Sequence, residues 1–136
     1  MNEIYQYRQE GQLYLWCYVN ERNYPGYHMA WSGLGQKNFI EFLNCLALSE
    51  SGTYRTLSLS KPTVEVLAVP NNKNSKISYI NKLRIEINNE CEWKFSIIES
   101  NAHLTLSSES ALKLAATCEK VKSQVELYHQ ELSFWW

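Results

Sequence analysis

Residues 82–97 read KLRIEINNECEWKFSI, and this stretch decides the fold. Apolar side chains occupy every second position on each side of a polar turn at 88–90. That period is typical of strands with one buried face and one wet face. A second turn at 100–101 precedes Leu104 and Leu106, which continue the alternation. We therefore expect an antiparallel three-strand meander in the middle of the chain.

Two shorter runs near the N-terminus predict a hairpin. Residues 13–19 alternate strictly, and residues 27–31 form the second run after a loop that contains a Pro-Gly pair. Both faces of the first run are apolar. Such a strand is either covered on both sides, or it leaves one aromatic face for a partner (Tyr14, Trp16 and Tyr18).

Helical spacing appears in two places. An amphipathic helix is expected from about Leu34 until the segment before Gly52, because its apolar residues fall at i, i+3, i+4 and i+7: Phe39, Phe42, Leu43 and Leu46. The segment 107–110 supplies an N-cap and an acidic first turn for a second helix, which we expect to continue to about Ser123.

The C-terminal segment 124–136 fits two patterns. Apolar residues at helical spacing continue almost to the end, whereas Leu132, Phe134 and Trp136 alternate with their neighbours. We expect a terminal strand near 131–136. The run 53–59 predicts another strand, and 64–69, between two prolines, predicts an edge strand or a packed loop.

These elements predict one α+β domain over residues 1–136, in which an antiparallel sheet, made of the hairpin and the meander, packs with two α-helices. Helices and strands do not alternate regularly, and the chain has no repeat or linker segment. With 45% hydrophobic residues, a chain of this length can bury an independent core.

Composition argues against several classes of partner. The 13 basic and 14 acidic side chains give a net charge of −1, whereas nucleic-acid binders usually carry a basic excess, so we expect no nucleic-acid partner. No apolar run approaches the roughly 20 residues that cross a bilayer, so we expect no membrane partner either. The first residues lack the features of a secretory signal, which favours a cytoplasmic location.

Catalytic and metal-binding motifs are missing from the sequence. His28, His103 and His129 are isolated, and the four cysteines form no C-x-x-C pair. The glycines and lysine of segment 32–38 do not match the phosphate-loop pattern. The chain has no Asp, so every carboxylate pair would have to come from Glu. We expect no catalytic residue, no cofactor and no metal.

Aromatic residues are the remaining signal. Eight Tyr and Trp residues lie within the first 31 positions, and these side chains are enriched at interfaces. We therefore expect a non-catalytic protein-interaction module, such as an adaptor, an inhibitor, an immunity-type protein or a self-associating subunit. Its contact residues would come from the hairpin and its loop: Tyr14, Trp16, Tyr18, Tyr24, Tyr27, His28 and Trp31.

Two alternatives remain open at this point. One is a domain that binds a small molecule or carbohydrate in a pocket between the aromatic hairpin and the first helix. The other is a small enzyme that uses His28 or Cys91 at the edge of a loop.

Overall fold

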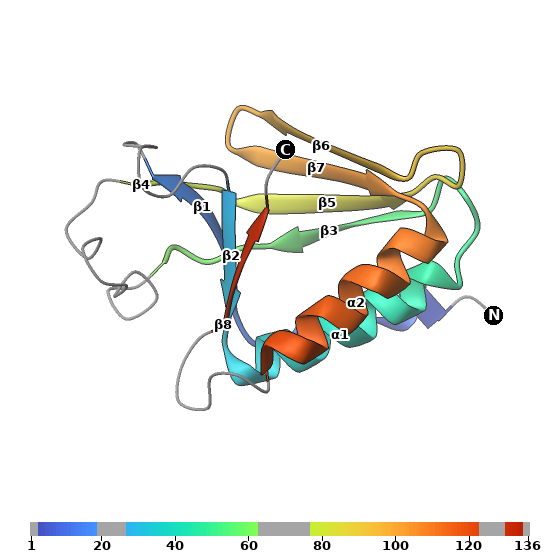
Figure 1. Ribbon diagram of the computed structural model, residues 1–136, viewed down its shortest axis with the longest axis horizontal. Helices are drawn as coiled ribbons and strands as arrows, with labels where there is room; N and C mark the ends of the chain where they lie inside the picture. The colour runs from blue at the N-terminus through green and yellow to red at the C-terminus, as the bar shows by residue number, and fades with distance from the viewer. Residues whose placement is uncertain (1–2, 19–26, 63–76, 123–129, 135–136) are drawn as a thin grey trace.

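A computed structural model describes residues 3–18, 27–62, 77–122 and 130–134 of the chain (Figure 1). The elements follow in this order: η1 (Glu3–Gln6), β1 (Leu13–Tyr18), β2 (Tyr27–Trp31), α1 (Gly33–Ala47), β3 (Tyr54–Ser58), β4 (Ile77–Tyr79), β5 (Lys82–Ile87), β6 (Trp93–Ile98), β7 (Asn101–Leu106), α2 (Ser108–Lys122) and β8 (Gln130–Phe134). The α+β class and the two helices are confirmed. The hairpin loop at 19–26 and the run 64–69 lie outside the described residues.

The first sheet, here called the hairpin sheet, is antiparallel throughout. β1 and β2 form the expected hairpin, with Leu13 opposite Trp31 and Cys17 opposite Tyr27. β4 pairs with the other side of β1, and β8 pairs with the other side of β2. A terminal strand therefore forms where alternation predicted one, and it joins the far end of the chain to the hairpin.

The second sheet, here called the central sheet, has the strand order β3-β5-β7-β6. The strands of the expected meander are all present, but β7 lies between β5 and β6 and runs parallel to β5. The sheet is therefore mixed and not a simple meander. The connection 88–92 holds β7 in this gap, because Asn88 N–H donates to the Leu106 carbonyl at 2.9 Å and Ser108 N–H donates to Asn89 Oδ1 at 2.9 Å.

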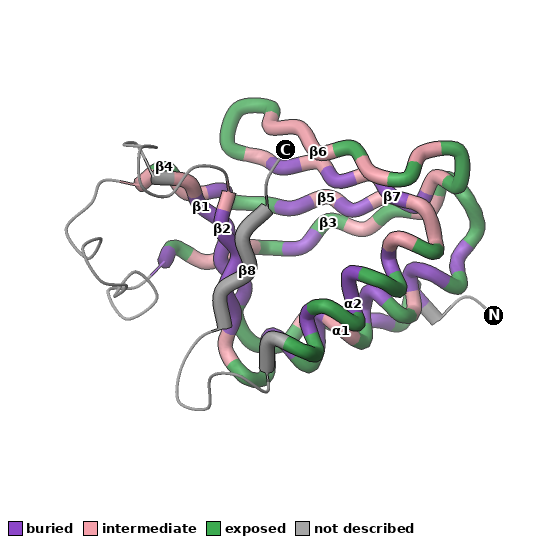
Figure 2. The backbone as a smooth tube through the Cα atoms, in the orientation of Figure 1, coloured by how far each residue is buried: buried purple, intermediate pink, exposed green. Residues whose placement is uncertain are grey.

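One apolar core joins the central sheet, the helices and one face of the hairpin sheet. In Figure 1 the two helices lie side by side beneath the central sheet, with β2 and β8 standing across one end of it. The inner face of the central sheet and the apolar stripe of α1 are buried (Figure 2). α2 contributes a buried face of small and medium side chains: Ala111, Leu114, Ala115 and Cys118.

Both helices begin next to a serine cap, which the sequence predicted for α2 but not for α1. Ser32 caps α1, with its Oγ accepting from Gly35 N–H at 3.0 Å. Ser107 Oγ accepts from Ser110 N–H at 3.1 Å at the start of α2. The helices are joined by the buried side chain of Gln36, whose Nε2 donates to the Cys118 carbonyl at 2.7 Å.

The N-terminal segment crosses the first turn of α1 at very short range. Ser32 N–H donates to the Gln12 carbonyl, and Gln12 N–H donates to Ser32 Oγ, both at 3.0 Å. A Cβ atom on Gly35 would overlap the Gln12 carbonyl, and one on Gly11 would overlap the backbone of Gly35. Gly11 also has a φ of 76°, which disfavours any side chain. Two glycines therefore make this crossing possible.

We predict that Gly35→Ala lowers the free energy of unfolding by about 2–4 kcal/mol, because the new methyl group pushes two hydrogen-bonded backbones apart. Gly33→Ala is the matched control, since a Cβ at Gly33 meets nothing within 4 Å. That control is expected to leave the stability unchanged or raise it by up to about 1 kcal/mol. Urea unfolding followed by tryptophan fluorescence measures both variants, and equal effects at the two positions would contradict the crossing.

Candidate functional site

The aromatic residues expected at a surface are largely inside the protein. One face of the hairpin sheet, with Trp31, belongs to the main core. The other face forms a second, smaller cluster of Tyr14, Trp16 and Ala30, against which Ile77 and Tyr79 of β4 pack. Of the two interpretations of this strand, cover on both faces is the one observed.

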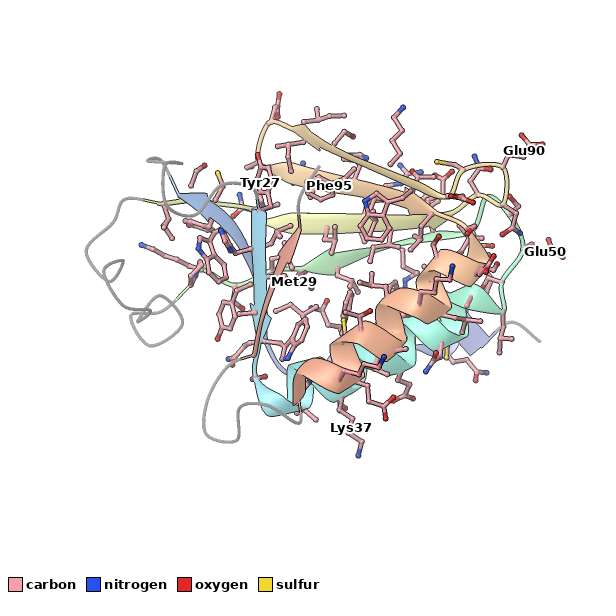
Figure 3. All side chains as sticks on the ribbon, in the orientation of Figure 1. Tyr27, Met29, Lys37, Glu50, Glu90 and Phe95 are labelled. Carbon is pink, nitrogen blue, oxygen red and sulfur yellow. The ribbon has the colours of Figure 1, made fainter. Side chains whose placement is uncertain are left out.

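The structure describes the side chains of five of the seven expected contact residues. Four members are at most 3% exposed: Tyr14, Trp16, His28 and Trp31. Tyr27 is half-buried, and its ring centroid lies 5.4 Å from that of Phe95 in β6 (Figure 3). The side chains of Tyr18 and Tyr24 lie outside the described residues, so their role stays a prediction. These four positions are therefore buried and not exposed: Trp16 stacks on His28 with 5.8 Å between the ring centroids, and on the other face of the sheet Trp31 packs against Phe39 in the main core.

The enzymatic alternative finds little geometric support. His28 is buried in the hairpin sheet, whereas Cys91 is half-buried in the turn between β5 and β6 of the other sheet. Within the described part of the chain, no three His, Cys or Glu side chains come together as a metal site requires.

Two buried titratable groups have a structural role. Tyr7 OH donates to Asn38 Oδ1, and Asn38 Nδ2 donates to the Arg8 carbonyl at 3.0 Å, which fastens the N-terminal segment to α1. Burial, partly offset by the charge of Arg55, raises the pKa of Tyr7 well above its usual range. Burial raises the pKa of Cys118 to about 12, so this side chain is a neutral thiol at pH 7 and a poor nucleophile.

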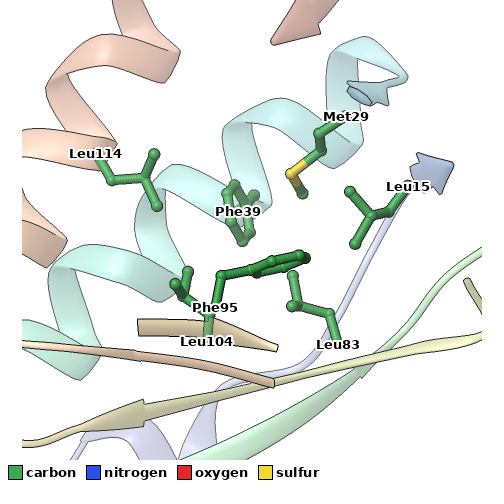
Figure 4. Close-up of a pocket in the computed structure, with 7 residues that line it drawn as sticks. All are labelled: Leu15, Met29, Phe39, Leu83, Phe95, Leu104 and Leu114. Atoms are coloured by element: carbon green, nitrogen blue, oxygen red, sulfur yellow. The ribbon is translucent and has the colours of Figure 1, made fainter. Parts of the chain in front are cut away.

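The space between the hairpin and the first helix is a packing void. It measures about 10 Å³ and is lined only by apolar side chains: Leu15, Met29, Phe39, Leu83, Phe95, Leu104 and Leu114 (Figure 4). Pockets for small molecules have about 300–1,000 Å³. The side chains in Figure 4 point toward one another from both sheets and both helices, as in a core. This void does not supply the ligand pocket expected there.

The two edges of the central sheet differ in a way that the sequence did not reveal. At the β3 edge, the Gln9 side chain binds both peptide groups of Ser58: Nε2 donates to the carbonyl at 2.6 Å, and Oε1 accepts from the N–H at 2.9 Å. Arg55 Nη1 adds a hydrogen bond to the Ile4 carbonyl at 2.6 Å. The N-terminal segment thus occupies part of this edge through these hydrogen bonds.

The opposite edge of the central sheet is β6. Of the strands that the structure describes, only β7 pairs with it. The side chains of Trp93, Phe95 and Ile97 are half-buried at the rim of the inner face, and Ile98 is 58% exposed on the outer face. Only one of its six residues, Lys94, is charged. This edge therefore carries one lysine and no proline, so it has few of the residues that usually protect an edge strand.

Comparisons with known proteins add no relative. Neither a protein-family model, nor a curated protein, nor a solved structure matches this chain. Among the described helices, none has the length and apolar character that crossing a bilayer demands.

We predict that Cys118 resists iodoacetamide at pH 8 in the folded protein and reacts only after unfolding, whereas Cys91 is modified in both states. Because the folded pKa of Cys118 lies above the ordinary value of 9.0, the unfolded chain loses this proton first as pH rises. The thiol's contribution to stability is thus complete below pH 9 and declines above it, by up to about 1.4 kcal/mol per pH unit.

Peptide mass spectrometry measures the labelling, and urea unfolding between pH 8 and 10 measures the stability. The difference in stability between the unmodified protein and Cys118→Ala should narrow as pH increases. A constant difference, or labelling of Cys118 in the folded state, would show that the thiol is not enclosed.

Proposed function

We propose that this chain is a non-catalytic protein-interaction domain that self-associates by pairing its β6 with β6 of a second copy. The observation that carries the proposal is the contrast between the two edges of the central sheet. At β3 the Gln9 side chain binds the backbone of Ser58, and Arg55 of β3 binds the Ile4 carbonyl, whereas β6 carries a single charge in a mostly apolar sequence. Edge strands of this kind are templates for pairing with another chain.

The turn between β6 and β7 determines which peptide groups of β6 point away from β7, toward the free side of the strand. The turn Glu99–Ser100 has two residues, and Glu99 has a φ of 59°, as the first position of a type II′ turn requires. In such a hairpin Ile98 and Asn101 form the closing hydrogen-bonded pair. The peptide group of Ile97, one residue earlier, therefore points away from β7.

The sequence of β6 is compatible with its own antiparallel copy. A two-fold axis beside Ser96 places Phe95 opposite Ile97 of the second copy, on the inner face of both central sheets. On the outer face the same register places Lys94 opposite Ile98, so that the lysine stem covers an exposed isoleucine. No like charges face each other, and each apolar pair contributes about 0.2–1 kcal/mol.

This pairing joins two central sheets into one continuous sheet with β6 at its middle. The contact is small, because one strand from each copy supplies most of it. Interfaces of this size are usually weak and transient, so we expect a dissociation constant on the order of 10–100 µM. The role of the domain is then to bring two copies together as concentration rises.

Charge substitutions at Ile98 test the pairing and its register. Ile98→Lys places two lysines opposite each other twice in every dimer and should raise the dissociation constant about ten-fold. Ile98→Glu places a carboxylate opposite Lys94 and should preserve or strengthen the dimer. Both changes are at the same exposed position, so the folded monomer is expected to tolerate them equally.

Sedimentation equilibrium measures the dissociation constants, and the double variant Lys94→Glu with Ile98→Lys should restore dimerisation. A protein that stays monomeric up to about 1 mM would overturn the proposal. Equal weakening by Ile98→Lys and Ile98→Glu would overturn the register, and with it the β6 pairing proposed here.

A further inference from the structure

A shallow depression lies on the outer face of the central sheet, over β3, β5 and β7. It has a volume of about 200 Å³ and is lined by Thr56, Lys82, Arg84, Asn101, Ala102 and His103. The strand register explains why these residues meet. Thr56 is opposite Arg84, Arg84 is opposite His103, and Lys82 is opposite Asn101 in the neighbouring row.

The side chains that line the depression include positive charges and hydrogen-bond donors but no negative charge. Lys82 and Arg84 are cationic, Thr56, Asn101 and His103 carry polar hydrogens, and none of the lining residues is a carboxylate. Lys82 and Arg84 are two residues apart on one strand and share its outer face, so their Cα atoms are roughly 7 Å apart. Two cations at this spacing can contact one tetrahedral oxyanion from two sides.

Arg84 is held in position before any ligand arrives. Its guanidinium carbon lies 3.7 Å from the centroid of the Tyr54 ring, and its Nη2 lies 3.1 Å from Glu86 Oε1. Glu86 lies in the next row, outside the lining, and engages one nitrogen of a group that has five N–H donors. The remaining donors keep a fixed orientation, so that binding immobilises less of the side chain.

The size of the depression restricts the ligand. A volume of about 200 Å³ is below the range of pockets for drug-sized molecules, about 300–1,000 Å³. The residues involved belong to β3, β5 and β7 and do not include any residue of β6. Self-association and occupation of this depression are therefore separable properties.

We propose that this depression binds a phosphate group, with Arg84 and Lys82 as its main contacts and Thr56, Asn101 and His103 as hydrogen-bond partners. The ligand is either inorganic phosphate or the terminal phosphate monoester of a small molecule. The site is open to solvent, which screens charge, so the dissociation constant is expected to be on the order of 1 mM.

Titration of the ¹⁵N-labelled protein, followed by NMR, tests the proposal. Inorganic phosphate and glycerol phosphate are added at constant ionic strength, with chloride as the balancing anion. Saturating shifts are expected at the amides of Thr56, Arg84 and His103. Equal affinity for both probes identifies free phosphate as the ligand, whereas at least about five-fold tighter binding of the ester identifies a phosphorylated small molecule.

Variants that each remove one positive charge distinguish phosphate binding at this depression from nonspecific electrostatic attraction of phosphate to the protein. Arg84→Gln and Lys82→Gln should each weaken binding about ten-fold or more. Lys37→Gln removes the same charge from α1, where Lys37 points away from the central sheet (Figure 3), and should have no effect. An unchanged spectrum up to about 20 mM phosphate, or equal losses in Lys37→Gln and Arg84→Gln, would overturn the proposal. Sedimentation of the same samples reports self-association independently.

Discussion

The crossing of the N-terminal backbone over α1 determines how the two sheets share one core. Ser32 takes part in three hydrogen bonds there, two with the backbone of Gln12 and one with the N–H of Gly35. Gly11 and Gly35 leave the room for this contact. β1 begins at Leu13, directly after Gln12. The crossing therefore orients one face of the hairpin sheet toward the helices and the central sheet. The crossing thus adds a second attachment between the hairpin and α1, beside the direct connection from β2 through Ser32.

This arrangement also accounts for the aromatic side chains. Both faces of the hairpin sheet are used for packing, so Trp31 enters the main core while Trp16 enters the second cluster. Three of the rings that look like surplus in the sequence, those of Tyr14, Trp16 and Trp31, are buried by the protein itself. Among the described residues, the largest exposed aromatic side chains are instead Tyr5 and Tyr54, which lie outside the hairpin sheet.

Alternation of apolar residues predicted the strands well, because the side-chain period depends only on the strand and the face it buries. The order of strands could not be derived in this way. The pattern of 82–87 is the same whether its neighbour is β6 or β7, and the choice is made by the turn 88–92 and its contacts with the end of β7. The depression on the outer face could not be predicted from the sequence for the same reason, because it depends on the order of the strands. Arg84 and His103 could be assigned to a wet face from sequence, but only the parallel pairing of β5 and β7 brings them side by side.

The position of β7 has a consequence for the synthesis of this protein on the ribosome. β5 and β6 emerge first, two strand positions or roughly 10 Å apart in the final sheet, and the strand that separates them is made last. β5 can already pair with β3, but β6 has no described partner strand until residues 101–106 have emerged and folded back. Until then the apolar side of β6 stays unpaired in the nascent chain, and unpaired strands of this kind favour aggregation and binding by chaperones.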